Sequence, residues 1–308
     1  ETPHASLAHA RLSIIDLEGG WQPLHAAGST IIGNGEIYNY LELSEEFQLQ
    51  GKLTTGSDFE PLLHIYAQEG ERAFDRLRGM YAFCLLGADG RTWLMRDPFG
   101  IKPLYIRSQA GAVAFSSEPR SFGAARVAPA ISKQVAALHY TLEGETAWPG
   151  VRRVEPGEII EVIDGEPKPH RMRSATEAIS PFAIRGRGTD DQALYALDRI
   201  LEDSINVHQR SDVPYGLFLS GGVDSATVAT VMSRLNARPV VAYTCGFDVP
   251  EARDERGQAE RVARALDLDW NNVSFDEADF WRIAPQVAWA MDDPVADYAC
   301  LPTYKLAE

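Results

Sequence analysis

The sequence predicts two domains of different fold class: an α+β domain of layered antiparallel sheets with helices, followed by an α/β domain with a doubly wound parallel sheet. The chain has 308 residues, 45% of them hydrophobic, which is enough for two ordinary cores. Short β-type runs alternate with glycine-containing turns in the first part, whereas helical and strand patterns alternate from residue 192 onward. Between them lies a stretch rich in Pro, Gly, Ser and Arg. We therefore expect the domains at 1–165 and 191–308, joined by a linker at 166–190.

The first domain is expected to contain six short strands and one clear helix. Ser57 to Glu60 has the spacing of a capping box and precedes a run of buried-type residues, so a helix should begin there and bury one face. The expected strands are 11–15, 30–33, 80–86, 92–95, 104–106 and 113–116.

The second domain follows a βαβ order. Parallel strands covered by helices bind ligands beyond the carboxyl ends of the strands, so a site is expected there. The expected elements are a helix at 193–207, a strand at 215–219, a helix at 224–235, a strand at 240–245, a helix through 260–266 and a strand at 272–275.

Composition excludes several classes of protein. The formal net charge of −15 argues against a nucleic-acid partner held by phosphate contacts. No apolar run is long enough to span a bilayer, and the first residues lack the features of a signal peptide, so we expect a cytoplasmic protein with small-molecule substrates and no membrane partner. Cys84, Cys245 and Cys300 are too few and too scattered for a disulfide framework or a zinc site, and Cys84 lies in an apolar run typical of a buried core.

The strongest motif is Ser220-Gly221-Gly222-Val223-Asp224-Ser225, where an expected strand gives way to an expected helix. Two glycines permit a tight turn, and the N–H groups that open the helix can bind an anion, for which phosphate is the natural candidate. The two serines can add hydroxyl donors, and Asp224 can hold a Mg²⁺ that bridges phosphate oxygens. No lysine follows the glycines as in a Walker A loop. The alternative is a serine-capped turn with a purely conformational role.

This motif resembles the pyrophosphate loop of ATP pyrophosphatases, which cleave ATP between its α and β phosphates and convert a carboxylate into an acyl-adenylate. The resemblance implies that the ends of two neighbouring strands flank the adenine: Phe218 with Leu219, and Cys245 with Gly246. An ordinary strand end is the alternative for the second pair.

A second set of motifs lies in the first domain: Arg11 to Ile15, Asn34 to Asn39, Gly56 to Asp58, and Arg96 to Tyr105. Taken alone, Asn34-Gly35 is typical of a hairpin turn, and Asp58 of a first-turn acid that favours the helix dipole. Together, these motifs resemble the glutaminase domain of class II glutamine amidotransferases, and with the Ser220 loop they resemble the glutamine-dependent asparagine synthetases. That family implies an Ntn-hydrolase-like fold for the first domain.

The roles that the resemblance implies suit the residue types. Arg11 offers a planar fork to the α-carboxylate of glutamine, while Glu36 and Asp58 receive its α-ammonium group. The Asn34 amide and the Gly35 N–H form an oxyanion hole, worth about 3 kcal/mol per donor in comparable acyl transfers.

One departure concerns the nucleophile. Members of the family start with a cysteine whose thiol attacks glutamine, whereas this chain starts at Glu1. We expect both ends of the natural chain to be missing from this sequence. A degenerate glutaminase that relies on free ammonia is the alternative.

Three acids, Asp292, Asp293 and Asp297, lie in a region that resembles the acceptor side of the family. They could serve Mg²⁺ or the acceptor, or form a solvated helix terminus.

The implied function is glutamine-dependent asparagine synthesis with ATP and Mg²⁺. Glutamine hydrolysis in the first domain supplies ammonia, which attacks an aspartyl adenylate in the second. Because ammonium has no lone pair, we expect the two sites to open toward a shared, closed interface. Amidation of a different carboxylate, β-lactam formation, and a non-catalytic nucleotide-binding protein are the alternatives, and a homodimer is possible in each case.

Overall fold

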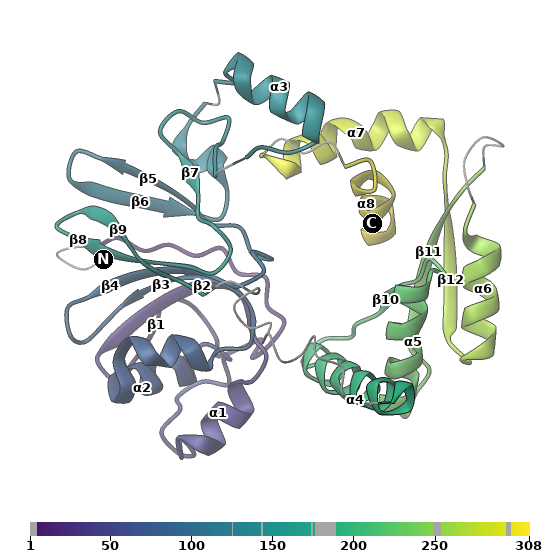
Figure 1. Ribbon diagram of the computed structural model, residues 1–308, viewed down its shortest axis with the longest axis horizontal. Helices are drawn as coiled ribbons and strands as arrows, with labels where there is room; N and C mark the ends of the chain where they lie inside the picture. Colours follow the sequence, from purple (N-terminus) through teal and green to yellow (C-terminus); the bar gives the residue numbers. More distant parts are fainter. Residues whose placement is uncertain are drawn as a thin grey trace. The chain divides into compact units, whose positions relative to one another are not determined.

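A computed structural model describes residues 5–124, 126–142, 144–173, 175, 189–248, 254–293 and 297–308. The chain forms two compact units, the first made of Glu1–Gln134 with Thr141–Arg185 and the second of Val135–Tyr140 with Gly186–Glu308 (Figure 1). Each unit has its own hydrophobic clusters.

The first unit contains two antiparallel sheets, as expected. The larger sheet has the order β1-β2-β3-β4-β8-β9 and the smaller the order β6-β5-β7. Strands of the larger sheet are β1 (Leu24–Ala26), β2 (Ser29–Ile37), β3 (Gly79–Leu86), β4 (Thr92–Arg96), β8 (Glu158–Ile163) and β9 (Glu166–Met172). Strands of the smaller sheet are β5 (Tyr105–Gln109), β6 (Ala112–Ser116) and β7 (Arg152–Arg153).

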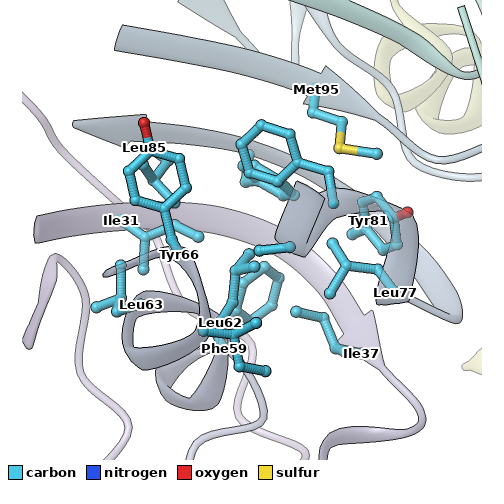
Figure 2. Close-up of a cluster of buried hydrophobic side chains, with 14 of the residues drawn as sticks. Ile31, Ile37, Phe59, Leu62, Leu63, Tyr66, Leu77, Tyr81, Leu85 and Met95 are labelled. Carbon is cyan, nitrogen blue, oxygen red and sulfur yellow. The ribbon is translucent and has the colours of Figure 1, made fainter. Parts of the chain in front are cut away.

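Alternation along the strands gives the larger sheet two buried faces. One face packs against α2 (Glu60–Glu69) and η1 (Gly70–Arg76) through the cluster shown in Figure 2, in which Ile31 and Leu85 meet Leu62 and Leu63. On the other face, Ile32 contributes to a cluster that includes Ile106 of β5. The unit is therefore layered as helix, sheet and sheet. Helices α1 (Tyr40–Glu46) and η2 (Pro119–Phe122) also belong to this unit, and α3 (Pro129–Leu138) is divided between the two units after Gln134.

Three local predictions for this unit are wrong. Residues 11–15 form no strand, because the Arg11 guanidinium binds backbone carbonyls of a turn instead. The linker does not begin at residue 166, because Glu166–Met172 pairs with β8 as an edge strand that tolerates Pro167 and Pro169. The helix near residue 57 begins at Glu60 without a capping box, since the Glu60 carboxylate accepts hydrogen bonds from Thr54 and Thr55. The rest of the expected linker up to residue 188 lies outside the described residues, apart from residues 173 and 175.

The second unit is built on the parallel sheet β10 (Leu217–Phe218), β11 (Val241–Phe247) and β12 (Asp269–Phe275), in that order. Ala242 faces small residues of α5 (Val223–Leu235) and α6 (Arg256–Ala265), whereas Cys245 packs on the opposite face with α7 (Glu277–Met291) and α8 (Cys300–Ala307). Helix α4 (Asp190–His208) contacts α5 through Ile205. The parallel sheet with helices on both faces is therefore confirmed. Its strands follow chain order.

Candidate functional sites

One pocket of the first unit contains all five residues predicted to handle glutamine. Its volume is about 470 Å³, within the range of small-molecule sites. The wall includes Arg11, Asn34, Gly35, Glu36 and Asp58. Three of them come from β2, Asp58 precedes α2, and Arg11 precedes β1. The fold thus brings together residues that the sequence places in three separate motifs.

Asn34 and Gly35 lie within strand β2, opposite Ala82 and Tyr81 of β3, so the hairpin interpretation is wrong. Gly35 has φ 136°, a left-handed conformation, and a Cβ there would lie 2.0 Å from the Met80 carbonyl oxygen. Glycine is therefore required at position 35 because the backbone there lies very close to the neighbouring strand β3. Within the described residues, the Asn34 amide nitrogen makes one long hydrogen bond, of 3.5 Å, to Ser117 Oγ, which leaves its second N–H available to the pocket.

Asp58 is a buried acid on the pocket wall, with only 6% of its surface exposed. The Ile37 N–H donates to its Oδ2 at 2.6 Å. Burial raises the pKa of Asp58 to about 7, and the nearby charge of Glu36 acts in the same direction, while backbone hydrogen bonds oppose the shift. A cationic group that enters the pocket would therefore favour the ionised form of Asp58.

The guanidinium of Arg11 is largely engaged by the protein itself. Its Nη2 donates to the carbonyls of Ile15 at 2.8 Å and Asp16 at 2.6 Å, and its Nη1 lies 3.4 Å from the carbonyl of Leu17. Both hydrogens of Nη2 are thus used, so Arg11 offers single donors and the expected free fork is not present. The same contacts fix the turn that the sequence had suggested as a strand.

The motif from Arg96 to Tyr105 forms a rigid turn at the edge of the pocket. Arg96 donates to the carbonyls of Gly100, Lys102 and Val154 at 2.6 to 2.7 Å. The Asp97 carboxylate accepts three backbone N–H groups at 3.0 Å, including that of Lys102. This turn places Lys102 on the pocket wall.

Two further pocket residues were missed from the sequence. The Gln22 side chain accepts from the Gly33 N–H at 2.6 Å and donates to the Gly33 carbonyl at 3.0 Å, and His9 contacts the same carbonyl. Burial lowers the pKa of His9, although its bond to Gly33 opposes this shift. No local pattern marks either residue, because their partner lies far along the chain.

The Ser220 loop of the second unit lies between β10 and α5, as predicted. Ser220 Oγ is 3.0 Å from Ser225 Oγ and accepts from the Gly222 N–H at 3.2 Å. In the part of the chain that the structure describes, no side chain caps α5, so the first N–H groups of this helix are available to an anion. Val223 is 84% exposed and Asp224 is also exposed at this helix start. Neither serine caps the helix, so the alternative of a serine-capped turn is wrong, while phosphate binding at the loop stays a prediction.

The two predicted adenine-flanking segments lie on neighbouring parallel strands. The Leu219 N–H donates to the Tyr243 carbonyl at 2.8 Å, next to Phe218, which pairs with Tyr243 in the sheet. Beyond them on β11, a Cβ on Gly246 would lie 2.0 Å from Arg256 Nε, so packing against Arg256 accounts for this glycine. Cys245 points to the opposite face, and burial is the main cause that raises its pKa.

No group of three or more His, Cys, Asp or Glu residues suited to a metal occurs in the described part of the chain. The Asp224 carboxylate beside the loop fits Mg²⁺ of the kind that uses one or two carboxylates together with phosphate oxygens. Asp292, Asp293 and Asp297 line another pocket of about 530 Å³, with Tyr298 and Cys300.

The three cysteines are free thiols, and burial raises the pKa of Cys84 to about 12, which makes it a core residue and a poor nucleophile. Among the described helices, none is both long and apolar enough to cross a bilayer.

Comparison with known proteins adds independent evidence. Residues 1–174 match the family described as "Glutamine amidotransferase domain", and residues 196–308 match "Asparagine synthase". The chain is 35% identical to asparagine synthetase (glutamine-hydrolyzing) 1 of Bacillus subtilis, over 99% of this chain and 48% of that protein. It is 32% identical to asparagine synthetase B (glutamine-hydrolyzing) of Escherichia coli, over 77% of this chain and 38% of that protein. It is also 29% identical to a protein named Amidase chry2 of Gibberella zeae, over 99% of this chain and 48% of that protein. The chain thus spans about half the length of the Bacillus subtilis relative and a smaller share of the Escherichia coli relative.

Proposed function

Since the chain belongs to the glutamine-dependent asparagine synthetase family, we propose that its protein transfers the amide nitrogen of glutamine to a carboxylate that ATP has activated, with aspartate as the acceptor. The observation that carries the proposal is the convergence of Arg11, Asn34, Gly35, Glu36 and Asp58 on one pocket.

In the first unit, the residues divide into those that bind glutamine and those that stabilise the transition state. Asp58 and Glu36 supply negative charge for the α-ammonium group, and Arg11 supplies single N–H donors for the α-carboxylate. The Asn34 amide and the Gly35 N–H are proposed to stabilise the oxyanion that forms when a thiol attacks the side-chain amide. Cys84 is a poor source of this thiol, because it is 1% exposed and burial raises its pKa to about 12. The nucleophile in the proposal is the amino-terminal cysteine that characterises the family.

In the second unit, the Ser220 loop and the start of α5 are proposed to bind the β and γ phosphates of ATP as the acceptor carboxylate attacks the α phosphorus. Pyrophosphate leaves, the carboxylate becomes an acyl-adenylate, and ammonia then displaces AMP to form the amide. Ser220 and Ser225 add hydroxyl donors at the loop. Asp224 would hold Mg²⁺, which neutralises phosphate charge when bound.

A second candidate function is amidation of a different carboxylate by the same machinery. It is favoured by the similarity over nearly the whole chain to relatives named amidases, at 29% identity.

The test is product analysis by mass spectrometry. The full-length protein would be incubated with ATP, Mg²⁺, amide-¹⁵N glutamine and a panel of carboxylates including aspartate. ¹⁵N-asparagine with equimolar AMP and pyrophosphate is the expected result. If the ¹⁵N label appears only in the amide of another carboxylate, that carboxylate and not aspartate is the acceptor. Release of AMP with no labelled product would contradict the proposal. We also propose a cytoplasmic location, with which the three free thiols agree.

A further inference from the structure

One peptide group of the Ser220 loop, between Gly221 and Gly222, is held at both ends. Its carbonyl oxygen accepts from Gln258 Nε2 of α6 at 2.6 Å. Its N–H donates to Ser220 Oγ at 3.2 Å, and that hydroxyl in turn lies 3.0 Å from Ser225 Oγ. A side chain outside the motif thus fixes the orientation of a peptide inside it.

The loop packs so closely against α6 that only glycine fits. Gly221 has φ 75°, and a Cβ there would lie 2.7 Å from the Ala259 nitrogen. Glycine has the widest choice of backbone conformations, so a Gly-Gly pair can rotate its peptide at low cost. Packing requires glycine at position 221 but does not fix the orientation of the peptide that follows it. We therefore expect its hydrogen bonds to fix that orientation.

The residue just before the loop is fixed by a different set of bonds. The Leu219 carbonyl accepts from Thr244 Oγ1 at 2.7 Å, and Thr244 Oγ1 accepts from Trp270 Nε1 at 2.8 Å. The Leu219 N–H is held by the Tyr243 carbonyl. With Leu219 anchored to β11, Gln258 adds a hydrogen bond from outside the motif to those that Ser220 and Ser225 make at the middle of the loop.

Orientation matters because the loop precedes the N-terminus of α5, where an anion is favoured. The hydrogen bond from Gln258 holds the Gly221 carbonyl, with its partial negative charge, toward α6. In the proposed binding mode the anion lies instead at the loop hydroxyls and the helix start. A rotated peptide would turn this oxygen toward the anion and repel it.

We propose that Gln258 is a positioning residue that keeps the Ser220 loop in its phosphate-binding orientation, so that the pyrophosphate portion of ATP binds a preorganised loop. The inference rests on the proposed function of the second unit. Gln258 acts through the loop and needs no contact with the nucleotide. It lies outside the motif that identified the loop.

The experiment compares three variants of the full-length protein with wild type. Gln258→Met removes the N–H donor at similar length, Gln258→Glu replaces it with a charged acceptor, and Arg264→Gln breaks the Arg264–Glu260 pair on the same helix as a matched control. Calorimetry would measure the Kd for pyrophosphate with Mg²⁺, and steady-state kinetics the KM for ATP and kcat. Glutamine hydrolysis would be measured on the same samples, below the unfolding temperature of every variant.

Loss of one neutral hydrogen bond should weaken pyrophosphate binding about three- to tenfold in Gln258→Met, with a similar rise in the KM for ATP and a smaller change in kcat. Gln258→Glu should bind pyrophosphate still more weakly. Pyrophosphate binding by Arg264→Gln should stay within about twofold of wild type, and so should the rate of glutamine hydrolysis in every variant. If wild type binds pyrophosphate and Gln258→Met binds it equally well, the role of Gln258 is refuted but the proposed function is not. If wild type binds neither pyrophosphate nor ATP, both are refuted.

Discussion

Asp58→Asn tests whether a buried charge in the pocket is kept for ligand binding at the expense of stability. Asp58 is 6% exposed, and burial raises its pKa from 3.8 to about 7. The folded state therefore binds one more proton than the unfolded state between these two pH values. The stabilisation from that proton is complete below about pH 4 and is lost as the pH rises through about 7.

The magnitude follows from the size of the shift. About three pKa units at 1.36 kcal/mol each give a cost of about 4 kcal/mol for the ionised carboxylate at pH 8 relative to pH 4. Asparagine carries no charge and keeps an oxygen for the Ile37 N–H. The free energy of unfolding of Asp58→Asn minus that of wild type should therefore increase by up to about 4 kcal/mol between pH 4 and pH 8.

Urea unfolding at pH 4, 6 and 8, followed by circular dichroism, measures this difference. Glu18→Gln, which changes an exposed acid of the same unit, serves as the control and should show no such dependence. In wild type, the KM for glutamine should rise as the pH falls below about 7, because protonation removes the charge that binds the α-ammonium group. In Asp58→Asn it should be high at every pH. A stability difference that does not change with pH would refute the reasoning.

Three other substitutions test the remaining parts of the two sites. Arg11→Ala should raise the KM for glutamine at least tenfold, by about 1.4 kcal/mol or more, while ammonia-dependent synthesis is retained; equal loss of both activities would show that Arg11 mainly holds the turn at residues 15–17. Asp224→Ala should abolish ATP–pyrophosphate exchange without lowering the thermal midpoint, because Asp224 is exposed, and exchange at the wild-type rate would remove it from the nucleotide site. Gly35→Ala should destabilise the protein by about 3 kcal/mol or more, because the new Cβ would overlap the Met80 carbonyl. The control Gly51→Ala, which has open space around it, should lower the stability by about 1 kcal/mol. Similar thermal midpoints in calorimetry for the two variants would contradict this prediction.

The sequence determined the order and type of most elements, because that information is local. Short apolar β-type runs specified β3 and β4, and the change to βαβ order specified the parallel sheet of the second unit. Errors arose where particular contacts, one made by a side chain and one by a neighbouring strand, decided the local structure. Carbonyl contacts of Arg11 replaced an expected strand, and pairing with β8 turned the start of the expected linker into β9.

The candidate residues could likewise be chosen from the sequence, since motif order and residue chemistry singled out Arg11, Asn34, Glu36, Asp58 and the Ser220 loop. Only the tertiary structure decided what surrounds them. The pKa of Asp58 depends on burial that several elements create, and the requirement for glycine at position 35 comes from the adjacent strand. Gln258 reaches Gly221 from 37 residues away. These properties depend on distances between segments far apart in the chain. Such distances are set by folding, and local residue patterns contain no information about them.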